Sequence, residues 1–405
     1  MKKFMILWMV FLLGINVNGQ NLEEYLQYGA ENNPELQAAL KEYEAALEAV
    51  PQAKSLPDPL LSFGYFLSPV ETRVGPQQAK FGISQMFPWF GSLQARSSVS
   101  EALAQVRYEN YLQIRNSYFL KVRVNYYKLY EIKQVIRINN NNLDILKSWE
   151  NLAIRKYEGG LTGMVDVLRV QMMIAEMEST LQSLQKDYET QIQTFNLLLN
   201  KDSNEKLDLD SKLNFPDDDF EIQGDSLSNH PLISILEWRK LAAEKSIDVE
   251  KRNNKPNFGL GLDYILVGPA SSDIPESGKN VLMPMISLSL PIWGKKNEAR
   301  IHEKELTLES LESSHANMEN KLEMELINWT NSYNDSKRDY DLYNDLIGKA
   351  DQALRVLVAD YTSANKDFDE VLKMQQVLLK YEMALEKSIT SRYIAGAQID
   401  YLFNR

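Results

Sequence analysis

Four short segments of the chain alternate apolar residues with small or polar ones. The alternation runs through residues 61–67, 81–83, 258–266 and 286–290. A period of two residues puts all apolar side chains on one face of a strand. The pattern is typical of a strand in a membrane barrel, and it also fits a half-buried strand in a soluble sheet. The spacing predicts two β-hairpins, at residues 60–87 and 257–290.

The context of these segments favours the membrane interpretation. The loops Ser68–Ala79 and Val267–Lys279 are rich in proline, glycine, serine and charge, as loops in outside solvent are. Each hairpin is followed by aromatic residues, proline and glycine, at 87–91 and 291–294. Aromatic residues gather at membrane interfaces, and proline and glycine end a strand. We therefore expect all four strands to cross a membrane.

Long stretches with a helical period follow each hairpin. Apolar residues recur in steps of three and four over residues 129–157 and, more regularly, over 174–198. This spacing is a heptad seam. The segment 159–163, Gly-Gly-Leu-Thr-Gly, predicts a helix stop and a turn between the two seams, and 362–367 predicts a second turn. A helix over about 97–158 would be ~90 Å long, which suits the wall of a tube.

The same order of elements occurs twice in the chain. Pro34, Pro59 and Gly64 have counterparts 197 positions later, at Pro231, Pro256 and Gly261. The segments 88–91 and 157–171 match 291–294 and 361–375, at offsets of 203 and 204. Such a co-linear series indicates a duplication. The predicted organisation is repeat 1 (20–200), a linker (201–226) and repeat 2 (227–405). Each repeat has a helix, from Leu22 to about Val50 or from Pro231 to about Lys251, then a β-hairpin and a helical hairpin, at 92–200 or 295–400.

The first nineteen residues have the pattern of a secretory signal peptide. Lys2 and Lys3 precede an apolar run over Phe4–Ile15, with small residues after it. The run is too short for a spanning helix, which needs about 20 apolar residues. No later stretch is apolar enough to span a membrane as a helix. We expect cleavage after Gly19.

Composition narrows the possible chemistry. The chain has no cysteine, which argues against a disulfide framework, a thiolate metal site and an acylated cysteine after the signal. Its net charge is −12, and removal of Lys2 and Lys3 gives −14, whereas nucleic-acid binding needs a basic face. Three histidines leave little material for general-base or metal chemistry. We expect no enzyme activity, no cofactor and no resident metal.

Three motifs that resemble catalytic or metal sites have simpler explanations. The pair His302-Glu303 lacks the second histidine of a zinc-protease helix and fits a solvated helix face. The run Asp217–Asp219 lies in the polar linker, which we expect to be solvated. The methionines within Met172–Met177 recur at heptad spacing and are better explained by packing than by soft-metal binding.

The strand number requires assembly. Four strands cannot close a barrel, and lipid does not tolerate an open sheet edge. Identical subunits usually associate cyclically, and three chains would give twelve strands and a hollow interior. The predicted fold is mainly α with a small β part. Long antiparallel coiled-coil hairpins form an α-barrel, and four strands per chain contribute to a trimeric transmembrane β-barrel, with an internal two-fold repeat.

The order of elements and the motif Tyr157-x-x-Gly160, followed by Asp166-Val167-Leu168, resemble the outer-membrane efflux protein family typified by TolC. The resemblance covers nearly all of the chain after the signal. Residues 75–88 further resemble the heavy-metal branch, the CusC- and CzcC-like channels. Many members of that branch carry the acylated cysteine that this chain lacks. The family implies a homotrimer, a barrel in the outer membrane and a periplasmic helical extension. It also implies a periplasmic adaptor (membrane fusion) protein and an inner-membrane pump, commonly of the resistance–nodulation–division type.

The resemblance also implies functional residues. Adaptor docking is expected at the hairpin turns, which hold Gly160, Leu161, Thr162, Gly163, Ser363, Ala364 and Asn365. In the family, polar side chains beside these turns keep the inner end closed, and the matching positions here are Asp166, Tyr361 and Lys366. The alternative is that Asp166 caps the returning helix and Lys366 is a solvated turn residue.

The resulting prediction is a passive exit duct for small molecules or metal ions delivered by the pump and the adaptor. The competing interpretation is a secreted periplasmic coiled-coil scaffold or adaptor without a pore. A scaffold explains the heptads and the acidity of the chain. It does not explain two alternating hairpins at equivalent positions in both repeats.

Overall fold

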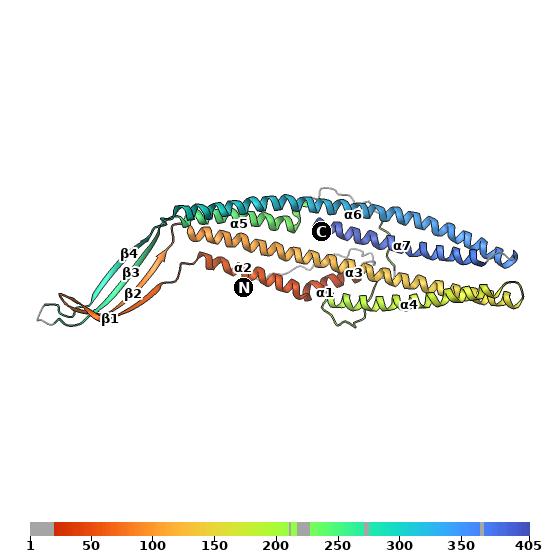
Figure 1. Cartoon of the computed structure of the whole chain (residues 1–405), viewed down its shortest axis with the longest axis horizontal. Helices are drawn as coiled ribbons and strands as arrows, with labels where there is room; N and C mark the ends of the chain where they lie inside the picture. The colour runs from red at the N-terminus through yellow and green to blue at the C-terminus, as the bar shows by residue number, and fades with distance from the viewer. Residues whose placement is uncertain (1–19, 210–211, 217–226, 271–274, 365–367) are drawn as a thin grey trace, which may run out of the picture. The chain divides into compact units, whose positions relative to one another are not determined.

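The computed structural model describes residues 20–209, 212–216, 227–270, 275–364 and 368–405. Its elements (Figure 1) are, in chain order, α1 (Gln20–Asn32), α2 (Pro34–Lys54), β1 (Leu60–Thr72), β2 (Gly75–Phe87), α3 (Ser92–Glu158), α4 (Met164–Leu198), η1 (Leu227–Asn229), α5 (Pro231–Asn253), β3 (Asn257–Val267), β4 (Val281–Ser289), α6 (Gly294–Ala364) and α7 (Phe368–Leu402). Two strands followed by two long helices therefore occur twice. The expected signal peptide and the run Asp217–Asp219 lie outside the described residues.

The chain divides into two compact units. Unit 1 comprises residues 1–37, 114–226 and 322–405, and unit 2 comprises residues 38–113 and 227–321. Each unit takes segments from both sequence repeats, and α2, α3 and α6 contribute to both units. Among the helices of the described residues, none has an apolar stretch long enough to cross a membrane.

Unit 2 contains one antiparallel sheet with the strand order β1-β2-β3-β4 (Figure 1). The register pairs Phe63 with Phe81, Phe81 with Tyr264, and Tyr264 with Leu282. Because directly paired residues share a face, the alternation in the four strands combines into one sheet-wide apolar face. Strands β1 and β4 form the two edges, and each pairs on one side only among the described residues.

The N-terminal helix predicted from Leu22 to about Val50 is divided in two. The side chain of Asn33 accepts hydrogen bonds from the backbone N–H groups of Glu35, at 2.8 Å, and Leu36, at 3.1 Å. Asparagine is a strong helix N-cap, and Pro34 occupies the first position of α2, where its missing N–H costs nothing. The Asn-Pro pair therefore ends one helix and starts the next.

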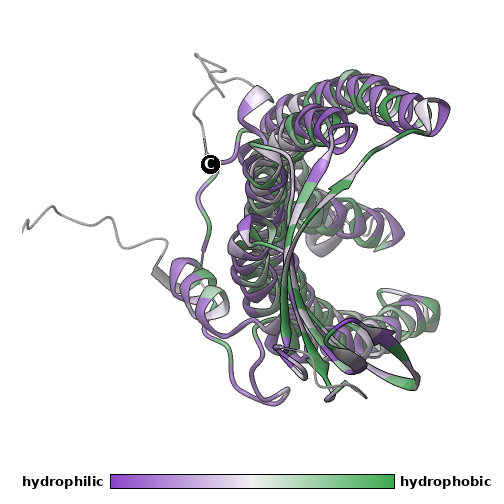
Figure 2. Ribbon diagram, turned by 90° about the vertical axis from the view of Figure 1, so that its left-hand side faces the viewer, coloured by the Kyte–Doolittle hydropathy of each residue, from purple (hydrophilic) through white to green (hydrophobic). Residues whose placement is uncertain are grey.

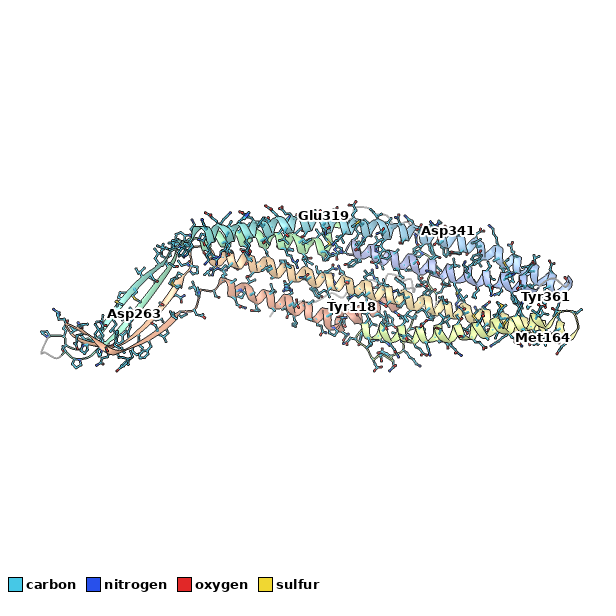
Figure 3. All side chains as sticks on the ribbon, viewed as in Figure 1. Tyr118, Met164, Asp263, Glu319, Asp341 and Tyr361 are labelled. Carbon is cyan, nitrogen blue, oxygen red and sulfur yellow. The ribbon has the colours of Figure 1, made fainter. Side chains whose placement is uncertain are left out.

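The core of unit 1 is built around α3. Its fully buried tyrosines Tyr118 and Tyr126 pack with Leu26 of α1 and Phe195 of α4 (Tyr118 is labelled in Figure 3). The hydroxyl of Tyr118 donates to the backbone oxygen of Leu198 at 3.2 Å. Burial raises the pKa of Tyr118 to about 12, so the phenol remains neutral.

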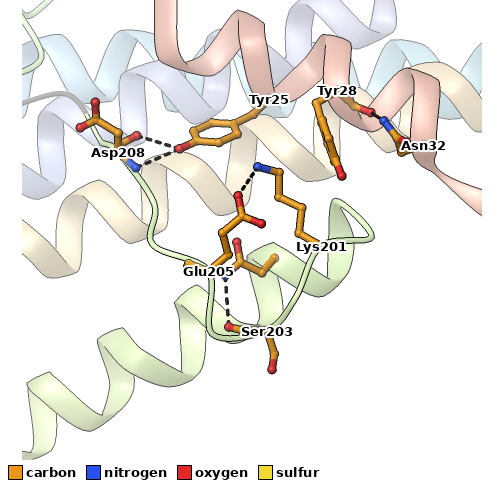
Figure 4. A network of polar contacts seen from close by, with 8 residues as sticks. Tyr25, Tyr28, Asn32, Lys201, Ser203, Glu205 and Asp208 are labelled. Carbon is orange, nitrogen blue, oxygen red and sulfur yellow. Dashed lines mark hydrogen bonds and ion pairs between the residues drawn. The ribbon is translucent and has the colours of Figure 1, made fainter.

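The segment after α4 packs against the helices, in contrast to the solvated linker expected there. The hydroxyl of Tyr25 donates to the backbone oxygen of Asp208 at 3.1 Å and accepts from its N–H at 2.9 Å (Figure 4). Lys201 pairs with Glu205 at 2.7 Å. Leu209 and Leu213 are buried in the unit 1 core. Scattered leucines in a polar stretch give no periodic signal, which is why this docking was missed.

Candidate functional site

The turn between α3 and α4 is a Schellman motif. Gly160 has a φ of +67°, a left-handed conformation that glycine adopts without strain. The N–H of Gly160 bonds to the oxygen of Tyr157 at 2.9 Å, and the N–H of Leu161 bonds to the oxygen of Lys156 at 2.8 Å. These two bonds satisfy the last carbonyls of α3. Gly163 differs, because it caps α4 in an extended conformation with a φ of −83°.

The two helical hairpins of unit 1 meet at Tyr361, which is 2% exposed (Figure 3). Its ring stacks on Phe368 at a centroid distance of 4.5 Å, so Tyr361 joins the ends of α6 and α7. The ammonium of Lys156, on α3, lies 4.1 Å from the centre of the same ring and also bonds the backbone oxygen of Tyr361. A cation held over an aromatic face is stabilised further when water is excluded.

Asp166 lies close to this cluster. The hydroxyl of Thr162, in the turn between α3 and α4, donates to a carboxylate oxygen of Asp166, in the first helical turn of α4. Burial raises the pKa of Tyr361, the negative charge of Asp166 raises it further, and the side chain of Thr162 partly opposes this. The structure thus brings Asp166 and Tyr361 together, and it places Asp166 in the first turn of α4, where a negative charge is favoured.

The remaining predicted tip residues have the following places. Leu161 is exposed in the first turn, and Ser363 donates from its hydroxyl to the oxygen of Ala359 at 2.8 Å near the end of α6. Ala364 is the last residue of α6. Asn365 and Lys366 lie outside the described residues, so their assignments stay predictions.

Sequence reasoning missed the charged contacts between the two hairpins. Arg169 of α4 lies 3.4 Å from Asp369 of α7, and Asp369 also pairs with Lys373. Lys156 was missed as well, because a lysine inside a heptad seam is normally read as solvated. The repeat alignment could have placed Arg169 and Asp369 near each other, since both closely follow matching turns, but nothing in the sequence pairs them.

An apolar groove follows the α6–α7 hairpin near these contacts. Its lining is mostly apolar and includes two charged residues: Ala353, Val356, Leu357, Met374 and Val377, together with Glu370 and Lys373. Val356 is largely exposed. Exposed apolar side chains with a polar rim are typical of protein–protein contact surfaces.

In unit 2, the sheet has two unlike faces. The apolar face exposes large side chains, including Leu61 at 76% and Ile286 at 83%. The hydropathy colours of Figure 2 show hydrophobic stretches along the strands. The opposite face presents small or polar residues, among them Ser62, Gly82 and Ser287. A sheet that exposes its apolar side chains instead of burying them requires an apolar environment.

An ion pair lies on the small-residue face of the sheet. Lys80 of β2 pairs with Asp263 of β3, whose side chain is 2% exposed (Figure 3). Gly82 makes room for this carboxylate, because a Cβ atom there would lie 2.5 Å from a carboxylate oxygen of Asp263. The pair explains how the polar face tolerates a buried charge.

The described residues include no cluster of three or more histidine, aspartate or glutamate side chains arranged to hold a metal ion. The candidate sites are therefore contact surfaces: the apolar groove of the α6–α7 hairpin and the exposed apolar face of the sheet.

Residues 26–201 match the model of a protein family described as Outer membrane efflux protein. The match covers less than half of the chain, the first of its two sequence repeats. Members of the family are channels rather than enzymes. No sequence among the curated proteins matches well enough to count as a relative.

Solved structures share the fold of this chain over nearly its whole length. The outer-membrane channel OprN is 18% identical with a TM-score of 0.80, and the match covers 95% of this chain and 90% of that one. The outer membrane protein VceC from Vibrio cholerae is 16% identical with a TM-score of 0.78, covering 96% of each chain. CusC is 14% identical with a TM-score of 0.80, covering 96% of this chain and 92% of that one. The mainly helical fold with a small four-stranded sheet, predicted from the sequence, is confirmed.

Proposed function

We propose that three copies of this chain form an outer-membrane channel, a passive exit duct without a catalytic step. The substrates, small molecules or metal ions, would be delivered by an inner-membrane pump of the resistance–nodulation–division type through a periplasmic adaptor. The match of residues 26–201 to the model of the outer membrane efflux protein family supports the role in efflux. The assignment to the heavy-metal branch rests on the resemblance of residues 75–88.

The observation that carries the proposal is the four-stranded sheet. Its apolar face is exposed, its opposite face is small and polar, and β1 and β4 each have one unpaired edge among the described residues. Lipid would cover the apolar face, and the small-residue face would line a pore. Pairing β1 of one copy with β4 of the next would close a ring and remove both edges.

The helical hairpins supply the second part of the proposal. We assign the periplasmic extension to α3, α4, α6 and α7, and adaptor docking to the turn at Gly160–Gly163 and the end of α6. The apolar groove beside Val356 and Met374 supports docking there, because it offers an apolar contact surface that the described residues leave exposed. The α-helical barrel would form when the hairpins of three copies associate.

A pair of adjacent substitutions tests whether the sheet faces lipid. Ile286 and Ser287 are neighbours in β4 and point to opposite faces. A lysine on a lipid-facing position costs about 2–4 kcal/mol near the bilayer midplane. Ile286→Lys should therefore prevent stable insertion, whereas Ser287→Lys should leave an inserted trimer.

The measurements are membrane fractionation with a carbonate wash, light scattering in mild detergent and single-channel recording in planar bilayers. We expect a carbonate-resistant protein with the mass of three chains and a discrete conductance, all lost in Ile286→Lys only. Release of the unmodified protein by carbonate, or a stable monomer with intact strand signal, would favour the pore-free scaffold. Equal tolerance of both lysine variants would contradict the lipid-facing assignment.

A further inference from the structure

The end of the sheet that joins the helices is rich in basic residues. Because the strands are antiparallel and Phe87 pairs with Phe258, all four strand–helix connections lie at this end (Figure 1). The connecting segments 52–59, 88–96, 251–256 and 290–297 contain one acidic residue, Asp58. They contain seven basic residues, which we call the basic collar: Lys54, Arg96, Lys251, Arg252, Lys255, Lys295 and Lys296.

This concentration is local. The whole chain has a net charge of −12. At the hairpin end of the sheet, the described charged residues balance: Glu71 and Glu276 accompany Arg73 and Lys279, and Glu276 pairs with Lys279 at 3.0 Å. A general need for solubility would not concentrate net positive charge at one end of the sheet.

The lysines of the collar are available for an outside partner. Arg252 is engaged by Asp248 at 2.9 Å, and Arg96 donates to Asn253 at 3.1 Å. The five collar lysines are exposed and form no ion pair with any described residue. Five uncompensated ammonium groups at one level of the molecule repel one another unless an anion lies between them.

Exposed aromatic residues lie directly beside these lysines. Trp293 is 70% exposed and lines a shallow hollow with Ile292, Gly294, Lys295 and Lys296. On the other hairpin, Phe90 is also exposed and lies beside Trp89, which stacks on Phe258 at a centroid distance of 5.7 Å. After β4 the order along the chain is apolar strand, aromatic residue, lysine, and after β2 it is apolar strand, aromatic residues and, further on, Arg96. In one leaflet of a membrane, the strand would lie among the acyl chains, the aromatic residue at the interface, and the basic residue beside the headgroup phosphates.

We propose that the basic collar binds the phosphates of anionic phospholipids in the leaflet nearest the helices. The inference rests on the proposed function, since it requires the sheet to cross a membrane. Tryptophan and isoleucine would contact the upper acyl region in the hollow, while Lys295 and Lys296 would bind the phosphate. For an acidic protein, the collar supplies the local attraction that overcomes repulsion from an anionic surface.

The test counts bound lipids on the full chain in mild detergent by native mass spectrometry. The probes are short-chain phosphatidylglycerol, which is anionic, and short-chain phosphatidylcholine, which is not. We compare Lys295→Gln/Lys296→Gln with Lys304→Gln/Lys321→Gln, a control pair further along α6. Affinity for phosphatidylglycerol should fall about fivefold for each collar lysine removed, equivalent to about 1 kcal/mol per basic residue. Phosphatidylcholine binding and the control pair should not change.

Two results would overturn the collar. One is equal binding of the two lipids by the unmodified protein, and the other is an equal loss in the collar and control variants. Channel recording on the same preparations separates this proposal from the proposed function. Conductance without a preference for phosphatidylglycerol overturns the collar and leaves the channel standing. Preferential binding without conductance supports the collar on a membrane-inserted sheet and overturns only the conducting role of the channel.

Discussion

The turn between α3 and α4 at Gly160 offers a sharp test of the Schellman assignment. Gly160 has a φ of +67°, and no atom lies within 4 Å of the place where a Cβ would be. Alanine would therefore meet no steric clash with its surroundings, and its cost comes from the backbone conformation alone. A non-glycine residue in the left-handed region costs about 1–2 kcal/mol. Gly160→Ala should weaken the two turn bonds made by the N–H groups of residues 160 and 161.

Gly163→Ala is the matched control, because Gly163 has a φ of −83° and a Cβ there would meet no atom closer than 3.9 Å. The assay is hydrogen exchange at the turn amides of the assembled protein. A cost of 1–2 kcal/mol corresponds to exchange about 5- to 30-fold faster at Leu161 in Gly160→Ala. Gly163→Ala should match the unmodified protein. Equal protection in Gly160→Ala, or equal loss in both variants, would refute the Schellman assignment.

Three further predictions concern charge. Burial lowers the pKa of His230, the cap of α5, to about 4. When the pH falls from about 6.5 to 4, His230 therefore takes up a proton in the unfolded chain before it does so in the folded protein. Thermal unfolding should show that the free energy of unfolding falls by about 3 kcal/mol over that pH range. This loss should be absent in His230→Asn, because asparagine keeps the helix cap. Lys80→Met leaves Asp263 without its ion-pair partner and should lower the stability of the detergent-solubilised protein by about 1–3 kcal/mol. This value is smaller than for a fully buried pair, because Lys80 is partly exposed. The double variant Lys80→Met/Asp263→Asn should recover most of the lost stability. If Asp166 holds the gate, Asp166→Ala should raise the open fraction of the channel in planar bilayers. Thr162→Ala removes the same hydrogen bond but keeps the charge of Asp166, so it should not raise the open fraction. Equal effects of the two variants would leave helix capping as the only role of Asp166.

Local signals were sufficient to predict most of the secondary elements. Period-two alternation marked the strands around Phe63 and Phe258, because apolar side chains share one face there. The expected loop Ser68–Ala79 was wrong in extent, because β1 continues to Thr72 and β2 begins at Gly75, with a register shift between Tyr65 and Val70. The glycines at 159–163 marked the first helical turn, because a left-handed residue is needed there. The division of the first helix was missed because the apolar spacing continues across Asn33. The helix is nevertheless interrupted there, because the side chain of Asn33 caps the start of α2.

Contacts between distant residues could not be predicted in the same way. Lys156 and Tyr361 are 205 positions apart, and no periodicity pairs a lysine in one hairpin with a tyrosine in the other. The same applies to Tyr25 and Asp208. The ion pair of Lys80 with Asp263 depends on the pairing of β2 with β3, which joins the two repeats.

The composition of the two units has a consequence for how the chain reaches its native state. The core of unit 1 contains Leu22 and Leu26 near the start of the described chain and Ile389 and Ala397 near its end. Neither sequence repeat can therefore complete this core alone, although the repeats are similar. Contacts so distant in sequence form late and slowly, and the apolar strands stay unprotected meanwhile. We expect folding to begin only once both halves are present, so that a chain truncated before α7 aggregates instead of forming half a molecule.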